Sequence, residues 1–158
     1  MNRVHSEQGF AYALVSSVPL QDTEATGIGI IFKARDRNTI GTHCEALDDA
    51  GTLAASYKAV MTVLKRALKA KVRGISIYVD DPRIIGQLQG DDEVPRELLG
   101  TNLQTRAMLH QVGRVRLIGA HSQRFSARRL AESARMRALD AAPRSARQLT
   151  LLPEDALA

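Results

Sequence analysis

A long amphipathic segment followed at once by a short apolar one constrains the fold more than any other feature of the sequence. Residues 50–71 carry apolar side chains at spacings of three and four, which is typical of an α-helix with one buried face. These side chains are Leu53, Tyr57, Val60, Met61, Leu64 and Leu68. Residues 75–80, ISIYVD, follow Gly74 and have the length and apolar content of a buried strand. A strand after a crossover helix lies parallel to an earlier strand, so the two segments predict an α/β domain.

Three further strand-like segments precede this helix. They are residues 9–18, 27–36 and 39–47. A turn signal around Asp36 separates the last two, and short connections between successive strands indicate an antiparallel meander. Asp48 or Asp49 can cap the helix that follows.

The rest of the chain adds a strand and three helices. We expect helices at residues 82–88, 96–111 and 126–141, and a strand at residues 114–122. The order β-β-β-α-β-α-α-β-α predicts a five-stranded mixed α/β sheet flanked by helices. Three of its strands form the antiparallel meander and two are parallel. We expect one domain over residues 1–142 and a C-terminal tail over residues 143–158.

Composition excludes several classes of protein. No apolar run approaches the roughly 18–20 residues of a membrane span, and the N-terminus has no apolar signal segment, so we expect a cytoplasmic protein without membrane contact. Cys44 is the only cysteine, which excludes an internal disulfide and a thiolate zinc cluster.

Four short motifs, in order along the chain, resemble those of the ribonuclease H family. They are IGII in the second predicted strand, A-x-Y-x-A in the long helix, VDDPRIIGQLQG from the fourth strand into the short helix, and Ala127, Leu130 and Ala131 in the last helix. The resemblance covers about residues 9–140 and is greatest for the bacterial and plant group. It implies the ribonuclease H-like fold.

The resemblance also implies where a catalytic site belongs. In that family four carboxylates hold two magnesium ions, which activate water to cut the RNA strand of an RNA–DNA hybrid. At the four positions this chain has Ser16 or Ser17, then Ser56, Asp80, and Arg128 or, with a shift of one residue, Arg129. Serine is a neutral, weak magnesium ligand, and arginine places a permanent cation where a metal would lie. We therefore expect no metal, no cofactor, lost hydrolysis, and an ion pair between Asp80 and Arg128.

The neighbouring Asp81 has a different interpretation. It stands before Pro82, and aspartate followed by proline is typical of a helix start.

A catalytically inactive domain that binds nucleic acid through a basic surface is the first functional hypothesis. The net charge is +5, and from Arg114 to Arg147 there are nine arginines and two acids. With 4% aromatic residues and no tryptophan, contacts should be non-specific and to backbone phosphates. The candidate residues are Arg116, Arg124, Arg128, Arg129 and Arg135. A solvated helix face explains the same arginines equally well. The family's phosphate-binding turn is replaced by PLQDTEAT, whose two acids weaken the case for family-type hybrid binding.

Two alternatives remain open. The first is a pseudoenzyme that acts as a protein-interaction or dimerisation module through the apolar tail LTLLPEDALA. A frayed terminus would also explain the tail, but its run of four apolar residues favours docking. The second is an active, magnesium-dependent hybrid ribonuclease with a shifted site made of Asp80, Asp81 and Glu132.

Overall fold

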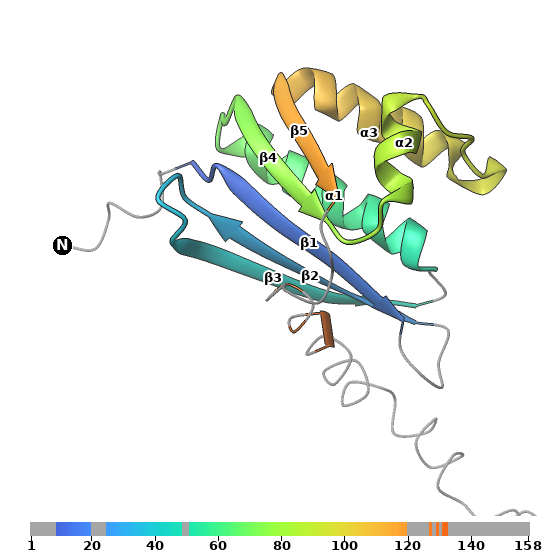
Figure 1. Ribbon diagram of the computed structural model, residues 1–158, viewed down its shortest axis with the longest axis horizontal. Helices are drawn as coiled ribbons and strands as arrows, with labels where there is room; N and C mark the ends of the chain where they lie inside the picture. Colours follow the sequence, from blue (N-terminus) through green and yellow to red (C-terminus); the bar gives the residue numbers. More distant parts are fainter. Residues whose placement is uncertain are drawn as a thin grey trace, which may run out of the picture.

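Five strands form a single mixed sheet in the order β3-β2-β1-β4-β5 (Figure 1). The computed structural model describes residues 9–19, 25–48 and 51–119, together with residues 127, 129, 131 and 132. The strands are β1 (Tyr12–Pro19), β2 (Thr26–Lys33), β3 (Thr39–Leu47), β4 (Gly74–Val79) and β5 (Arg114–Gly119). β1, β2 and β3 are antiparallel, whereas β4 is parallel to β1 and β5 is parallel to β4. The predicted five-stranded mixed sheet is confirmed.

Helices cover one face of this sheet. They are α1 (Thr52–Lys69), α2 (Arg83–Gln89), a short 3₁₀ turn η1 (Arg96–Leu98) and α3 (Leu99–Val112). Figure 1 shows α1 and α3 behind the sheet, and α1 packs on β1, β2 and α3. Tyr57, Val60 and Leu64 of α1 are fully buried against apolar side chains of the strands, such as Val15 and Ile77. None of the helices in the described ranges has the length and apolar character needed to cross a bilayer.

The start of α1 differs from the prediction. β3 extends to Leu47, and Gly51 still has an extended backbone, with φ −67° and ψ 165°. Gly51 is therefore the N-cap, no side chain caps the helix, and the predicted cap by Asp48 or Asp49 is wrong.

A buried polar network joins α1, α2 and α3. The Tyr57 hydroxyl donates a hydrogen bond of 2.9 Å to the Gln87 side-chain oxygen, and Asn102 Nδ2 donates one of 2.9 Å to the Tyr57 hydroxyl. Asn102 Nδ2 also donates to the Gln87 carbonyl oxygen at 3.1 Å. The network turns the Asn102 face of α3 inward, so Leu99 and Leu103 are 47% and 64% exposed.

The direction of the elements defines two ends of the sheet. β1, β4 and β5 begin at one end, which we call the amino end, and finish at the other, the carboxyl end. The turn between β2 and β3 lies at the amino end, because Lys33 pairs with Tyr12 and Thr39. α1 starts at the carboxyl end and leads back to the start of β4.

Candidate functional site

Polar side chains from β1 and β4 meet at the carboxyl end of the sheet. Val15 and Val79 are register partners in these adjacent parallel strands, so the residues that follow them lie at the same level. Ser16 Oγ donates a hydrogen bond of 2.5 Å to Asp80 Oδ2. The Ser17 backbone N–H donates a longer bond of 3.4 Å to Asp80 Oδ1. Asp80 is thus held by hydroxyl and amide donors of β1.

The first part of α1 adds a third serine to this group. The hydroxyls of Ser17 and Ser56 are 2.9 Å apart and share a hydrogen bond. Ser16 and Ser56 are almost fully buried. We call Ser16, Ser17, Ser56 and Asp80 the serine–aspartate cluster. The sequence predicted that these four residues share one site, and the structure brings them together from β1, α1 and the end of β4.

The fourth position of the site is only partly described. Arg128 lies outside the described residues, so its ion pair with Asp80 stays a prediction. Arg129 is described and exposed. Of the other candidate nucleic-acid-binding residues, Arg116 is exposed on β5, whereas Arg124 and Arg135 also lie outside the described residues.

The protein environment raises the pKa of Asp80. Burial is the largest cause, because a carboxylate loses its hydration there, and the charge of Asp81 acts in the same direction. The hydrogen bonds from Ser16 and Ser17 lower the pKa without cancelling the effect of burial. The cluster is thus a site where a negative charge is disfavoured.

Asp81 has a separate, structural task at the start of α2. Its Oδ1 accepts a hydrogen bond of 3.1 Å from the Arg83 backbone N–H, and its Oδ2 lies 2.6 Å from Arg83 Nη2. Pro82, which comes between them, already has helical dihedral angles of −68° and −18°. Burial raises the pKa of Asp81, but the bonds from Arg83 outweigh it, and the pKa is lowered overall. Asp81 therefore supports the start of α2 through Arg83, but the N-cap is Pro82 and no side-chain bond caps the helix, so the helix start predicted at Asp81 is one residue too early.

The side chains of the cluster do not fit a pair of magnesium ions. Magnesium prefers charged oxygen ligands, and two-metal sites share several carboxylates between ions about 3.5–4 Å apart. The three described family positions here supply one carboxylate and serine hydroxyls. Within the described ranges, no three or more His, Cys, Asp or Glu side chains form a group that could hold a metal ion. Asp80, Asp81 and Glu132 are all described and belong to no such group, and whether the chain cleaves a hybrid stays a prediction.

Three polar side chains of β3 and α1 form a group that the sequence did not predict. Glu45 Oε1 accepts a bond of 2.8 Å from Lys58 Nζ, and Glu45 Oε2 lies 3.3 Å from His43 Nε2. The Lys58 bond is the main reason why the pKa of Glu45 is lowered. The alternation of His43 and Glu45 on one strand face was the available signal. Nothing in the sequence indicated that Lys58 would reach them.

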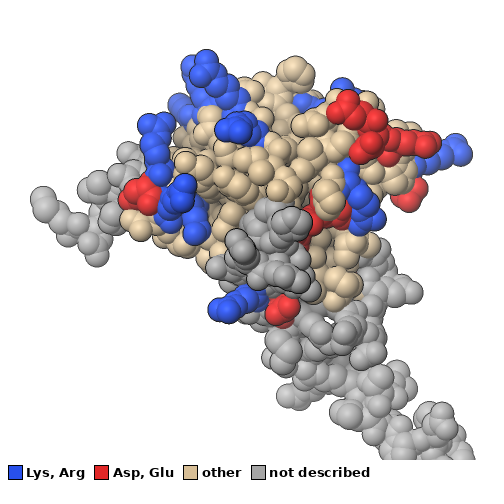
Figure 2. All heavy atoms as spheres, viewed as in Figure 1, with Lys and Arg blue, Asp and Glu red and all other residues tan. Residues whose placement is uncertain are grey.

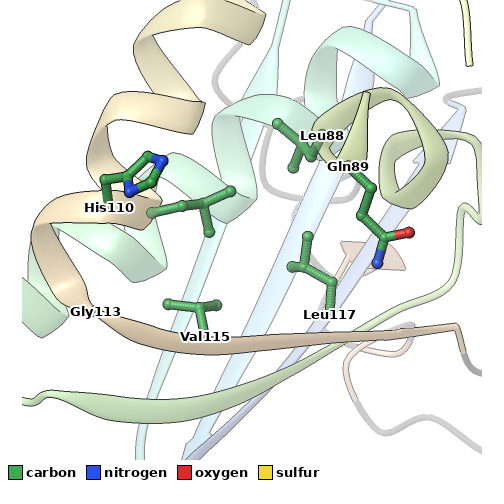
Figure 3. Close-up of a pocket in the computed structure, with 7 residues that line it drawn as sticks. Leu88, Gln89, His110, Gly113, Val115 and Leu117 are labelled. Atoms are coloured by element: carbon green, nitrogen blue, oxygen red, sulfur yellow. The ribbon is translucent and has the colours of Figure 1, made fainter. Parts of the chain in front are cut away.

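A small pocket lies apart from the serine–aspartate cluster. It measures about 210 Å³ and opens between α2, α3 and β5. Figure 3 shows Leu88, Val115 and Leu117 forming its apolar wall, with His110 and Gln89 at the sides. The lining is mostly aliphatic and shares no residue with the cluster.

Comparison with known proteins bears on the fold. No family model and no curated protein matches the sequence. Among solved structures, the N-terminal ribonuclease H domain of a Mycobacterium tuberculosis protein is 20% identical, with a TM-score of 0.73, and the match covers 84% of this chain and 99% of that one. Ribonuclease H1 of the archaeon Halobacterium salinarum is 17% identical, with a TM-score of 0.69, over 83% of this chain and 98% of that one. LC11 ribonuclease H1, solved with an RNA/DNA hybrid, is 16% identical, with a TM-score of 0.72, over 81% of this chain and 98% of that one.

These likenesses, the strand order and the short motifs agree with one another. The resemblance predicted from the sequence is confirmed at the level of structure, and the chain has the ribonuclease H-like fold.

Proposed function

We propose that the chain is a ribonuclease H-like domain that binds nucleic acid through backbone phosphates without hydrolysing it. The serine–aspartate cluster carries this proposal. Three positions that hold carboxylates in the resembling family are brought together here, and Asp80 is the only carboxylate among them. Such a domain can lose hydrolysis and still bind nucleic acid, because the metal ligands occupy few positions and the phosphate contacts use other surfaces.

The hydrogen bonds of Asp80 support the loss of hydrolysis. Its two oxygens accept from Ser16 and Ser17, and its pKa is raised chiefly by burial. A metal-binding carboxylate must be charged and must direct its lone pairs at the ion, which this environment disfavours.

Retained binding is supported by fold and charge. The LC11 enzyme of the same fold was solved with an RNA/DNA hybrid. The chain has a net charge of +5 and few aromatic residues, which favours contacts to phosphates over stacking on bases.

A cleavage assay combined with a binding titration tests both halves of the proposal. A labelled RNA–DNA hybrid should stay intact with magnesium or manganese, while duplex binding should be measurable at low salt and fall steeply as salt increases. Cleavage that disappears in Asp80→Asn would show an active enzyme and overturn the proposal. Cleavage that persists in Asp80→Asn would identify a contaminant. Absence of binding at low salt would refute nucleic-acid binding.

One observation favours a second candidate, a protein-interaction module. Leu99 and Leu103 lie one turn apart on α3 and are 47% and 64% exposed, which is unusual for leucines on one helix face. The tail that first suggested this function lies outside the described residues. Sedimentation of the full chain should show a mass above that of the monomer, and Leu103→Lys should return it to the monomer. A monomeric full chain would exclude self-association.

A further inference from the structure

Three segments that are distant in sequence bring cations to the amino end of the sheet. They are the turn between β2 and β3, the end of α1 with the residues that lead into β4, and the start of β5. We define the amino-end basic surface by six exposed side chains of these segments. They are Arg35 and Arg37 in the turn, Lys69, Lys71 and Arg73 at and after the end of α1, and Arg114 at the start of β5. Figure 2 shows Lys and Arg gathered at the left and upper left, where Figure 1 draws the starts of the parallel strands.

The three segments are tied together by specific contacts. Arg114 N–H donates a 2.9 Å bond to the Arg73 carbonyl, which fixes the starts of β4 and β5 beside each other. The Arg66 guanidinium lies 4.3 Å from the centre of the Phe32 ring, which joins the last turns of α1 to β2. The six side chains therefore project from one rigid framework.

None of the six is neutralised by a described partner. Among the described residues between 9 and 119, the ion pairs join Lys58 to Glu45 and Arg83 to Asp81, and the His43 ring lies 3.3 Å from Glu45. Asp36 lies in the same turn as Arg35 and Arg37, but its carboxylate accepts two bonds from Asn38, at 3.0 and 2.8 Å. Asp36 thereby shapes the turn, and the surface keeps a large excess of positive charge.

The opposite end of the sheet has no comparable excess of cations. Glu45, Asp48, Asp80 and Asp81 lie at the carboxyl end. The two cations described beside them, Lys58 and Arg83, are paired with Glu45 and Asp81 and are less available to phosphates.

Two of the six residues occupy a backbone conformation that side chains normally avoid. Arg37 has a φ of 70° and Lys71 a φ of 57°. Lys71 follows α1 where glycine is favoured, and Gly90 fills the matching position after α2 with a φ of 83°. Each left-handed non-glycine residue costs roughly 1–2 kcal/mol. Long cations at strained positions indicate a use for the side chain beyond folding.

We propose that the amino-end basic surface binds the phosphate backbone of double-stranded nucleic acid, so that the chain contacts its ligand at the end opposite the serine–aspartate cluster. This inference rests on the proposed function, because it names the surface that performs the binding. Arginine and lysine supply charge-assisted bonds to phosphate oxygens. The absence of tryptophan and the low aromatic content argue against a stacking platform for single strands.

A pair of double variants with equal loss of charge tests the inference. Arg35→Gln with Lys69→Gln removes two cations of the surface, and Arg96→Gln with Arg106→Gln removes two exposed cations elsewhere. Each lost duplex-phosphate contact should reduce the slope of log K against log salt by about 0.9. We expect the first variant to lower the slope by roughly 2 and the affinity at low salt by at least about tenfold. The second variant should leave the slope unchanged.

The outcomes separate the inference from the function on which it rests. If the parent chain binds no duplex at low salt, the proposed function fails. If the parent binds and both variants lose affinity equally, or the first loses none, the amino-end location is wrong. Binding to vesicles of anionic lipid without binding to duplex would assign the surface to membranes and overturn the inference. Melting temperatures confirm that each variant is folded.

A second measurement uses the unaltered chain. Saturating duplex should protect Lys69 and Lys71 from acetylation while Lys58, at the carboxyl-end part of α1, reacts as before. Protection of Lys58 alone would contradict the inference.

Discussion

Asp80 and Asp81 show how far neighbouring identical residues can differ. The first is buried among serines, and its pKa is raised mainly by burial. The second is also penalised by burial, but bonds from Arg83 bring its pKa below the ordinary value. The sequence already separated the two roles, because Pro82 follows only Asp81. It could not show which donors surround Asp80, since these come from β1, 63 and 64 residues away.

The raised pKa of Asp80 predicts a variant that is more stable than the parent. A folded-state pKa above the unfolded value means that the folded state binds the proton more tightly, so stability falls as the pH rises through the raised pKa. Asp80→Asn removes this penalty. The variant should unfold at higher urea concentration at pH 7, and its advantage should vanish as the pH is lowered below 3.8, the ordinary pKa of the group.

The exposed Asp91→Asn serves as control for the loss of one charge. If Asp80→Asn is less stable than the parent at neutral pH, Asp80 is charged and paired with a cation, as the predicted contact with Arg128 requires.

Removing the buried hydroxyl of Tyr57 should destabilise the fold, because this hydroxyl joins the hydrogen-bond network between the helices. Tyr57→Phe would leave the Gln87 side-chain oxygen without its donor and take an acceptor from Asn102. An unsatisfied buried polar group costs about 1–3 kcal/mol. Urea unfolding should show a loss of that size, whereas Tyr12→Phe, at a half-buried position with no bond of its hydroxyl among the described contacts, should change little. Equal losses in the two variants would contradict the role of the network.

At the scale of elements, hydrophobic periodicity located the helices and strands well wherever their buried side chains are apolar. It located α1, β3 and β4 to within two or three residues, because their buried positions are apolar side chains at regular spacing. It failed to identify the buried face of α3, where Asn102 and Thr105 are buried while Leu99 and Leu103 are exposed. A hydrogen-bond network between helices leaves no periodic signal in one segment. Asn102 could not have been recognised as a core residue from sequence alone.

The left-handed residue after α1 predicts opposite effects on stability and binding. Lys71→Gly should stabilise the fold by about 1 kcal/mol, because glycine adopts this conformation without strain. It should also weaken duplex binding, because a cation of the amino-end basic surface is lost. The matched variant Lys69→Gly lies inside the last turn of α1 and should destabilise by about 1 kcal/mol. Urea unfolding and a duplex titration on the same samples decide the matter. Lower stability of Lys71→Gly would show that the lysine itself supports the helix end.

At the scale of the whole molecule, the basic surface depends on topology. The nine arginines after residue 113 drew attention because they lie close together in sequence. The cations of the amino-end surface come from three separate segments, and no segment on its own has enough of them to suggest a binding surface. They become one surface only when the turn, the end of α1 and the strand starts share one end of the sheet. The serine–aspartate cluster could be assembled from sequence because family motifs supplied that topology in advance.

The predicted domain boundary can be checked by truncation. Ala127 and Ala131 are fully buried, so the fold extends past β5. A chain ending at Ala142 should keep the circular dichroism spectrum and the unfolding free energy of the full chain to within about 0.5 kcal/mol. A chain ending at Gly119 loses both buried alanines and should be less stable. If the chain ending at Ala142 is clearly destabilised, the tail belongs to the folded domain.

The uneven placement of charge also gives the molecule a direction. Cations without a described partner gather at the amino end, whereas Glu45 and Asp81 at the carboxyl end are paired with Lys58 and Arg83. The positive potential is therefore strongest at one end of the strands. A polyanion's field would rotate such a molecule before contact, so that most encounters begin with the correct end forward. Association would then be faster than the net charge of +5 alone implies.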